Sequence, residues 1–358
     1  MNQRTLTLIA VNLLIFAVGV GGILYKKHQT PPPAPIVQQR PDDGMTNPLP
    51  NPPELPPIIN NITKAQPSYM NYEATVAQLQ TWNKEAPEMT EVGSYGKTAR
   101  GKDIYYIRVC NKRYNVDKPV VMITACIHGN EPLASSTVMW YIGDMLSKYG
   151  KDQAITQLLD SRDIYFVPVV SPDSYPNSRH VDGVDPNRDF PGPSRPSHRS
   201  TPSVKAIQDF YMKIKPKAVI SGHTWGRVYL TPYGDKMQNC PDHDAIWAVM
   251  KKCQELSGYR LIRACDMYQG NGGLNNPPIR VGHDEDMCSC MRPGWGSVPI
   301  HGSEVDWYYR NGAFAIVCEF GTHQRVPSDA DTQTEFNKTY SAFLHFVKEA
   351  PLVQVHPQ

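Results

Sequence analysis

Four short, mainly apolar segments constrain the fold of this 358-residue chain more than any other feature. They cover residues 120–126, 164–170, 218–221 and 313–319. The first reads VVMITAC and offers no polar face. A strand that is apolar on both of its alternating faces must be buried on both, as the central strands of a parallel sheet are. Residues 104–109 are expected to add a further strand.

Helical patterns separate these strands. Apolar residues recur at helical spacing in 135–148, 204–213, 246–257 and 334–346, and also at Tyr72, Val76 and Leu79. Strands that alternate with helices predict one α/β domain over residues 67–350, followed by a tail at 351–358. Its sheet should be central, twisted and mixed but mostly parallel, with helices on both faces.

Residues 5–25 form an uncharged run between Arg4 and Lys26. A helix of this length spans about 30 Å, the hydrocarbon thickness of a bilayer. We expect a transmembrane signal anchor after a short flank at residues 1–4, and a cleaved signal peptide is the alternative. Both place the rest of the chain outside the cytoplasm, in the periplasm or extracellular space. The chain would be membrane-anchored in the first case and secreted in the second.

Residues 26–66 are predicted to be a disordered linker. Eleven prolines lie between Pro31 and Pro57, and hydrophobic periodicity is absent. Such a segment cannot bury enough apolar surface to fold, and it favours extended polyproline-like states. It would hold the folded domain away from the membrane.

The charge balance excludes one class of partner. The chain carries 36 lysines and arginines against 34 acidic residues, which gives a net charge of +2. Proteins that bind nucleic acid through its phosphates usually show a basic excess. We therefore expect no nucleic-acid partner.

A histidine and a glutamate follow the first apolar segment directly, in His128-Gly129-Asn130-Glu131-Pro132. Functional groups in open α/β sheets gather at the carboxyl ends of strands. Gly129 lets the chain turn, and Pro132 suits the first turn of a helix. His128 and Glu131 can therefore converge on one metal ion, although by themselves they fit a solvated turn as well.

Two other apolar segments end in residues suited to the same site. Residues 218–221 lead into His223, and 313–319 end in Glu319. Together with His128 and Glu131, His223 completes the His2Glu set of a catalytic zinc, which leaves a fourth position open for water. A carboxylate such as Glu319 can take a proton from that water and pass it to a leaving amine. Taken alone, Glu319 fits an ion-paired strand residue equally well.

The segment Asp185-Pro186-Asn187-Arg188 offers a place for a carboxylate. An arginine binds a carboxylate through two parallel hydrogen bonds, and an adjacent amide adds a donor. The same residues are also typical of a turn.

Together these motifs resemble the M14 family of zinc carboxypeptidases. His128-x-x-Glu131, Asn187-Arg188, His223 and Glu319 occur in the order and context of that family. Supporting matches are Gly96-Lys97-Thr98, Ser171-Pro172-Asp173, the segment 229–234 and Gly302-Ser303-x-x-Asp306-Trp307. The resemblance covers about residues 69–350. With the N-terminal segment, it indicates a bacterial-type exported member.

The resemblance implies a zinc carboxypeptidase-like fold and a metallocarboxypeptidase activity. His128, Glu131 and His223 would bind one Zn²⁺ per chain. Glu319 would act as the general base and then as the general acid. The implied reaction is the hydrolysis of a C-terminal peptide bond by metal-activated water.

The resemblance also assigns the substrate contacts. Asn187 and Arg188 would hold the free C-terminal carboxylate of a peptide or muropeptide. Arg179, nine residues before Arg188, would polarise the scissile carbonyl and stabilise the oxyanion.

Two positions depart from the family or stay open. The family often has a tyrosine ahead of Gly302 that closes over the substrate, and residues 295–301 contain none, which leaves Trp295 or His301 to cover the site. The residue that lines the specificity pocket is Val305 or its neighbour Glu304. Val305 would favour an apolar side chain, and Glu304 a basic one.

Five cysteines lie in the irregular stretch between His223 and Glu319: Cys240, Cys253, Cys265, Cys288 and Cys290. One or two disulfides are expected here in an exported protein. A second metal site that uses these cysteines with His243 and His283, or buried free thiols, are the alternatives. Cys126 and Cys318 are expected to be small core residues.

Three other functions remain open. An exported enzyme of this fold could act as a peptidoglycan peptide amidase or carboxypeptidase that cuts a cell-wall stem peptide. It could instead be a deacylase of small N-acyl amino acids. A protein that kept the fold without the reaction would be a non-catalytic binding module.

Overall fold

The structure, a computed structural model, describes residue 62 and residues 69–114, 116–236, 238–267 and 300–357. The fold below is that of the compact unit Pro56–Gln358. The expected anchor at 5–25 lies outside the described residues, as does almost all of the linker. Among the described helices, none combines the length and the apolar character that a membrane crossing needs.

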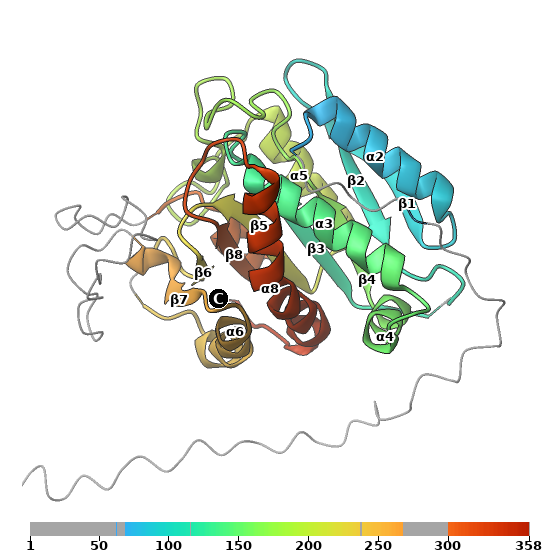
Figure 1. The fold of residues 1–358 in the computed structure, drawn as a ribbon. Coiled ribbons are helices and arrows are strands. Elements are labelled where there is room, and N and C mark those ends of the chain that lie inside the picture. The colour runs from blue at the N-terminus through green and yellow to red at the C-terminus, as the bar shows by residue number, and fades with distance from the viewer. Residues whose placement is uncertain (1–61, 63–68, 115, 237, 268–299, 358) are drawn as a thin grey trace, which may run out of the picture. The chain divides into compact units, whose positions relative to one another are not determined.

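Eight strands form one sheet in the order β1-β2-β4-β3-β5-β8-β6-β7 (Figure 1). Four neighbouring pairs are parallel, namely β4–β3, β3–β5, β5–β8 and β6–β7, and the other three are antiparallel. The strands are β1 (Thr90–Lys97), β2 (Asp103–Val109), β3 (Val120–Ala125), β4 (Asp163–Val167), β5 (Ala218–Thr224), β6 (Val228–Thr231), β7 (Arg260–Arg263) and β8 (Phe314–Phe320). The predicted mixed, mostly parallel sheet is confirmed.

Helices cover both faces of the sheet. In Figure 1, α3, α6 and α8 lie in front of it and α5 lies behind. The helices are α2 (Tyr72–Glu85), α3 (Pro132–Lys148), α4 (Gln153–Ser161), α5 (Pro202–Ile214), α6 (His243–Ser257), α7 (Glu304–Arg310) and α8 (Asp329–Glu349). Short 3-10 turns occur at η1 (Pro186–Arg188), η2 (Ala264–Asp266) and η4 (Ala350–Leu352).

The central strands lie where their apolar sequences predict. Every residue of β5 and of β8 is buried, including the polar ones that end each strand. Helix ends follow local chemistry: Pro132 begins α3, and Ser328 with Asp331 forms a capping box at the start of α8. The strands at the centre of the sheet therefore end in buried residues whose side chains are packed on all sides.

Elements with weak sequence signals were missed. Strand β1 reads TEVGSYGK, and it lies at the edge of the sheet where alternation of polar and apolar residues is not enforced. Strands β6 and β7 have four residues each, and α7 has seven. Segments this short carry too few apolar repeats to show a period.

The six described cysteines are buried free thiols: Cys110, Cys126, Cys240, Cys253, Cys265 and Cys318. The expected disulfides are therefore wrong for Cys240, Cys253 and Cys265, each of which packs as a small apolar side chain. Cys288 and Cys290 lie outside the described residues, together with His283. Cys126 and Cys318 are core residues, as predicted.

Candidate metal centre and active site

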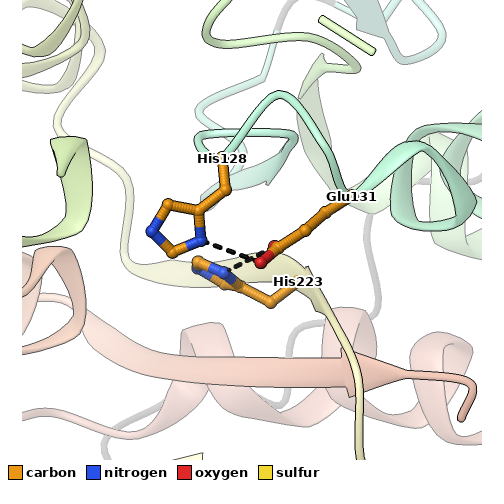
Figure 2. Close-up of side chains that lie close together, drawn as sticks. All are labelled: His128, Glu131 and His223. Atoms are coloured by element: carbon orange, nitrogen blue, oxygen red, sulfur yellow. Dashed lines mark hydrogen bonds and ion pairs between the residues drawn. The ribbon is translucent and has the colours of Figure 1, made fainter. Parts of the chain in front are cut away.

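The three predicted ligands converge at the carboxyl ends of the central strands β3 and β5. The candidate ligand atoms of His128, Glu131 and His223 all lie within 4.8 Å of one another, and the three side chains are buried. Nδ1 of His128 lies 2.9 Å from Oε1 of Glu131, and Nδ1 of His223 lies 2.9 Å from its Oε2. Figure 2 shows both imidazoles turned toward this one carboxylate. This is the one such cluster among the residues that the structure describes.

The turn after β3 delivers His128 and Glu131. Cys126 adopts a φ of +52°, in the left-handed region, where the chain leaves the strand. Gly129 lies in this turn, where it was expected to let the chain bend. The structure gives a different reason for the glycine: a Cβ would come within 2.4 Å of the backbone carbonyl carbon of Ser174. Glu131 then occupies the N-cap position of α3, without a capping hydrogen bond from its side chain, which leaves its carboxylate for the site. The predicted strand–turn–helix placement is confirmed, with close backbone packing as the reason for the glycine.

The charges of this cluster favour a cation at its centre. Burial alone would raise the pKa of Glu131, but the imidazoles of His128 and His223 outweigh it and hold that pKa well below its usual value. Burial likewise opposes a charge on His223, yet the carboxylates of Glu131 and Glu304 raise its pKa well above the usual value. A positive charge is therefore favoured beside Glu131, and a bound metal cation would supply it.

The residues fit a zinc ion. Two imidazole nitrogens and one carboxylate are the donor set of many catalytic zinc sites. Imidazoles that bind a metal commonly donate their second N–H to a carboxylate. Here Nε2 of His128 lies 3.0 Å from Oδ1 of Asp185, and Nε2 of His223 lies 2.7 Å from Oε1 of Glu304. In each imidazole, a carboxylate therefore binds Nε2, while Nδ1 faces Glu131 and the metal position.

Glu319 lies beside the ligands. It pairs in register with His223 across β5 and β8, and it lines the same cavity. Burial raises the pKa of Glu319 to about 7, the neighbouring His223 lowers it and Glu131 raises it further. Such a carboxyl group can exchange a proton near neutral pH.

The substrate-binding candidates line the same cavity, beside the metal ligands. Asp185 ends the preceding loop, and its carboxylate accepts a hydrogen bond from the backbone N–H of Asn187 at 2.9 Å. The segment Asp185-Pro186-Asn187-Arg188 therefore forms a turn and also contributes to the site, so both readings of its sequence apply. Arg188 lines the cavity, and its Nη1 donates to the carbonyl of Asn187 at 2.7 Å. Arg179 also lines the cavity, where it donates to Asp185 at 2.9 Å and lies 3.8 Å from Glu131.

The cavity has a volume of about 110 Å³, and its wall has two contrasting ends. The polar end carries the metal ligands, Glu319, Arg179 and Arg188. The other end, called the apolar wall below, is lined by Leu230, Ala264, Met267, Ile300, Val305 and Val317.

The choice between Val305 and Glu304 is now decided. Val305 lines the cavity, whereas the carboxylate of Glu304 is directed to His223. Of the two candidates, Val305 is the one that lines the cavity. His301 is exposed and lies 3.4 Å from the hydroxyl of Ser194, outside the cavity lining, and Trp295 lies outside the described residues.

Three contacts of the ligands were not anticipated from the sequence. Asp185 and Glu304 bind the two imidazoles from behind, and Gln324 donates to Oε1 of Glu131 at 3.3 Å and to the carbonyl of Thr224 at 3.1 Å. Asp185 could have been found, because a carboxylate two residues before Asn187 is visible in the sequence. Glu304 and Gln324 carry no local signal, since their partners are distant along the chain.

Comparisons with known proteins agree with this geometry. The family model for zinc carboxypeptidases of the peptidase M14 family matches residues 75–342. Mouse carboxypeptidase A4 is 26% identical over 278 residues, which cover 68% of this chain and 60% of that protein. Rat carboxypeptidase A2 is 31% identical over 196 residues, which cover 44% of this chain and 47% of that protein. The chain thus spans less than two thirds of the length of these curated relatives.

Solved structures share the fold. The crystal structure of thrombin activatable fibrinolysis inhibitor has a TM-score of 0.67 at 18% identity, and the match covers 80% of this chain and 75% of that one. Carboxypeptidase A from Helicoverpa armigera has a TM-score of 0.60 at 16% identity, with 81% and 76% covered. The matched family model spans well over half of the sequence and includes every residue of the metal cluster. The chain belongs to the peptidase M14 family of zinc carboxypeptidases.

Proposed function

We propose that this chain is a zinc-dependent carboxypeptidase that removes a C-terminal residue with an apolar side chain. The observation that carries the proposal is one cavity that contains the metal ligands, Glu319, Arg188 and the apolar wall together. A peptide end has the same sequence of parts: a scissile carbonyl, a free carboxylate and a side chain between them.

Arg188 and Asn187 select the free carboxylate. A guanidinium binds a carboxylate through two charge-assisted hydrogen bonds, and these strengthen in a cavity that excludes water. Asn187 is 9% exposed, and its side-chain oxygen already accepts a hydrogen bond from the backbone of Glu304 at 2.8 Å. Its amide nitrogen, 3.4 Å from Nε2 of His223 beside the metal ligands, is the donor that we assign to the substrate carboxylate.

Glu319 and Arg179 serve the reaction. A zinc ion held by His128, Glu131 and His223 would polarise the carbonyl and make water acidic enough to react near neutral pH. Glu319 accepts the proton of that water and then gives it to the leaving amine. Arg179 places positive charge where the oxyanion develops, which is the step where electrostatic stabilisation contributes most.

The apolar wall sets the preference for the side chain. Within the described lining of that end, the side chains are all apolar, and the nearby carboxylate of Glu304 is turned away toward His223. A lysine or arginine side chain would lose its hydration there without finding an opposite charge. Apolar residues would gain about 25 cal/mol for each Å² removed from water.

We also propose that the protein is a bacterial-type exported enzyme, anchored by residues 5–25 with its catalytic domain outside the cytoplasm. The support is the uncharged 21-residue run between Arg4 and Lys26 and the proline-rich segment after it. Protease protection of the folded domain in whole cells tests this: a domain that external protease cannot reach in cells with a permeable outer layer contradicts export.

The test of the activity uses the full-length protein, loaded with zinc. It is incubated with matched peptides that end in leucine, phenylalanine or lysine, each as free acid and as amide, and with muropeptides, and the products are weighed by mass spectrometry. We expect loss of one residue from the leucine and phenylalanine free acids. Equal cleavage of the amides would contradict a carboxypeptidase, and cleavage of muropeptides alone would assign a cell-wall stem peptide as the substrate.

Removal of a ligand checks the metal assignment independently. His223→Ala should lose bound zinc, measured by atomic absorption after gel filtration, and with it all peptide cleavage. A His223→Ala protein that keeps one zinc per chain would refute the ligand set. His345→Ala, which changes a half-buried histidine outside the metal cluster, is the matched control and should keep its zinc.

A further inference from the structure

The two candidate zinc-binding imidazoles, those of His128 and His223, each have a carboxylate within hydrogen-bond distance of Nε2. Nε2 of His128 is 3.0 Å from Asp185, and Nε2 of His223 is 2.7 Å from Glu304. Asp185 is part of the Asn187-Arg188 segment. Glu304 comes from a different part of the chain, 81 residues after His223 in sequence, at the start of α7.

Glu304 is buried more completely than Asp185. It is 1% exposed, whereas the side chain of Asp185 is 19% exposed. An ionised carboxylate in such a place costs several kcal/mol unless a donor or a cation compensates it. The imidazole N–H of His223, 2.7 Å from Oε1 of Glu304, is a donor that compensates this burial.

The backbone of Glu304 has a second contact in the site. Its N–H donates to Oδ1 of Asn187 at 2.8 Å, and Nδ2 of Asn187 lies 3.4 Å from Nε2 of His223. Gly302, which has a φ of +76°, brings this segment against the backbone of Arg188, where a Cβ would come within 2.5 Å of the carbonyl oxygen. The position of Glu304 is therefore fixed by close backbone packing and not by its own side chain.

We propose that Glu304 is a positioning residue for the metal. Its carboxylate accepts a hydrogen bond from Nε2–H of His223, which fixes the tautomer and the ring orientation that direct the Nδ1 lone pair toward Glu131 and the metal position. The contact also increases the basicity of Nδ1 as a ligand. The proposal rests on the zinc site of the proposed function, but not on peptide cleavage.

The test compares zinc affinity in full-length wild type and Glu304→Gln, by competition with a chromophoric chelator at fixed pH. Glutamine keeps the size of the side chain but removes the charge. We expect about 10- to 100-fold weaker zinc binding. The matched control is Glu335→Gln, an equally buried carboxylate at 2% exposure that contacts Arg227 and Tyr259 instead. It should bind zinc as wild type does.

Cobalt gives a second reading of the site. In the Co²⁺-loaded protein the visible absorption bands report the ligand geometry, and Glu304→Gln should shift them while Glu335→Gln leaves them unchanged. Unchanged zinc affinity and unchanged bands in Glu304→Gln would overturn the proposal. A loss of affinity in both variants alike would also overturn it, because burial alone would then explain the effect.

A measurement on wild type decides the matter if Glu304→Gln does not fold. In the zinc-loaded, ¹⁵N-histidine-labelled protein, the proposal expects the proton of His223 on Nε2, protected from exchange and shifted downfield. A His223 ring without a proton on Nε2 would refute it. All these readings concern metal binding, so wild type that binds zinc through this contact and yet cleaves no peptide would refute the proposed function alone.

Discussion

The polar and the apolar ends of the cavity are built in different ways. At the polar end, the metal ligands and Glu319 come from the ends of β3, β5 and β8, three neighbouring strands in the middle of the sheet, and the two arginines come from the segment between β4 and α5. The apolar wall takes Leu230, Ala264 and Val305 from three short elements, β6, the turn η2 and α7, and only Val317 from a central strand, β8. The same substrate would touch both ends within a few ångströms.

The difference separates the reaction from the choice of substrate. Strand ends in the centre of a sheet are held by hydrogen bonds on both sides, so they can fix catalytic groups to the tolerance that acid–base chemistry requires. The apolar wall needs only shape and the exclusion of water. Substitutions at the polar end should therefore change the rate, and those at the apolar end the preference.

The largest expected effect is at Glu319. Glu319→Gln removes the base and should lower kcat by about 10²- to 10⁴-fold, while the zinc content stays at the wild-type level. Steady-state kinetics and atomic absorption on the same preparation check this. If the variant keeps a kcat near that of wild type, Glu319 is not the general base, and the reaction does not depend on the polar end in the way proposed.

The next effect concerns Arg188. Arg188→Ala removes charge-assisted hydrogen bonds worth about 1.5–3 kcal/mol and should lower kcat/KM for free-acid peptides by about 10- to 150-fold. Rates on the matched amides, already low, should hardly change. Equal losses on acids and amides would point to a disturbed site and not to a lost carboxylate contact.

Val305→Asp tests the apolar wall. The new carboxylate should penalise a C-terminal leucine and favour a lysine, which changes the ratio of their kcat/KM values by about 10- to 100-fold. Val116→Asp, at a valine that is 36% exposed and outside the cavity lining, is the control and should leave the ratio as it was. An unchanged ratio of the two kcat/KM values in Val305→Asp would show that the apolar wall does not determine which C-terminal side chain is preferred.

The smallest effect at neutral pH is the acid limb of the rate profile. Burial raises the pKa of Glu319 from 4.5 to about 7, and a bound metal cation would lower it again. A base acts when ionised, so activity should be present above this pKa and fall as pH decreases through it. We expect the midpoint of kcat/KM between these two values, and its loss in Glu319→Gln. A flat profile over that range would contradict the assignment.

Much of the polar end was predictable because its signals are local. His128 and Glu131 are three residues apart directly after an apolar strand, and His223 and Glu319 each end a strand of the same kind. Asn187 and Arg188 are adjacent. Parallel strands bring such ends to one edge, so finding the strands was sufficient to bring the residues together.

The apolar end was not predictable in the same way. Leu230 and Ala264 lie on β6 and η2, elements of four and three residues that have no periodic signal. The disulfides expected among Cys240, Cys253 and Cys265 were wrong, because spacing and inferred compartment do not show which thiols are packed in the core.

The sequence by itself determined the chemistry of this protein, namely two imidazoles, a carboxylate ligand, a catalytic carboxylate and an arginine, each after a recognisable strand or turn. Only the tertiary structure decided what Glu304 and Val305 do. Successive residues of a helix point about 100° apart, so one step along α7 separates a side chain that holds His223 from one that lines the pocket. That direction depends on how α7 packs against β5 and β8, which no local pattern contains.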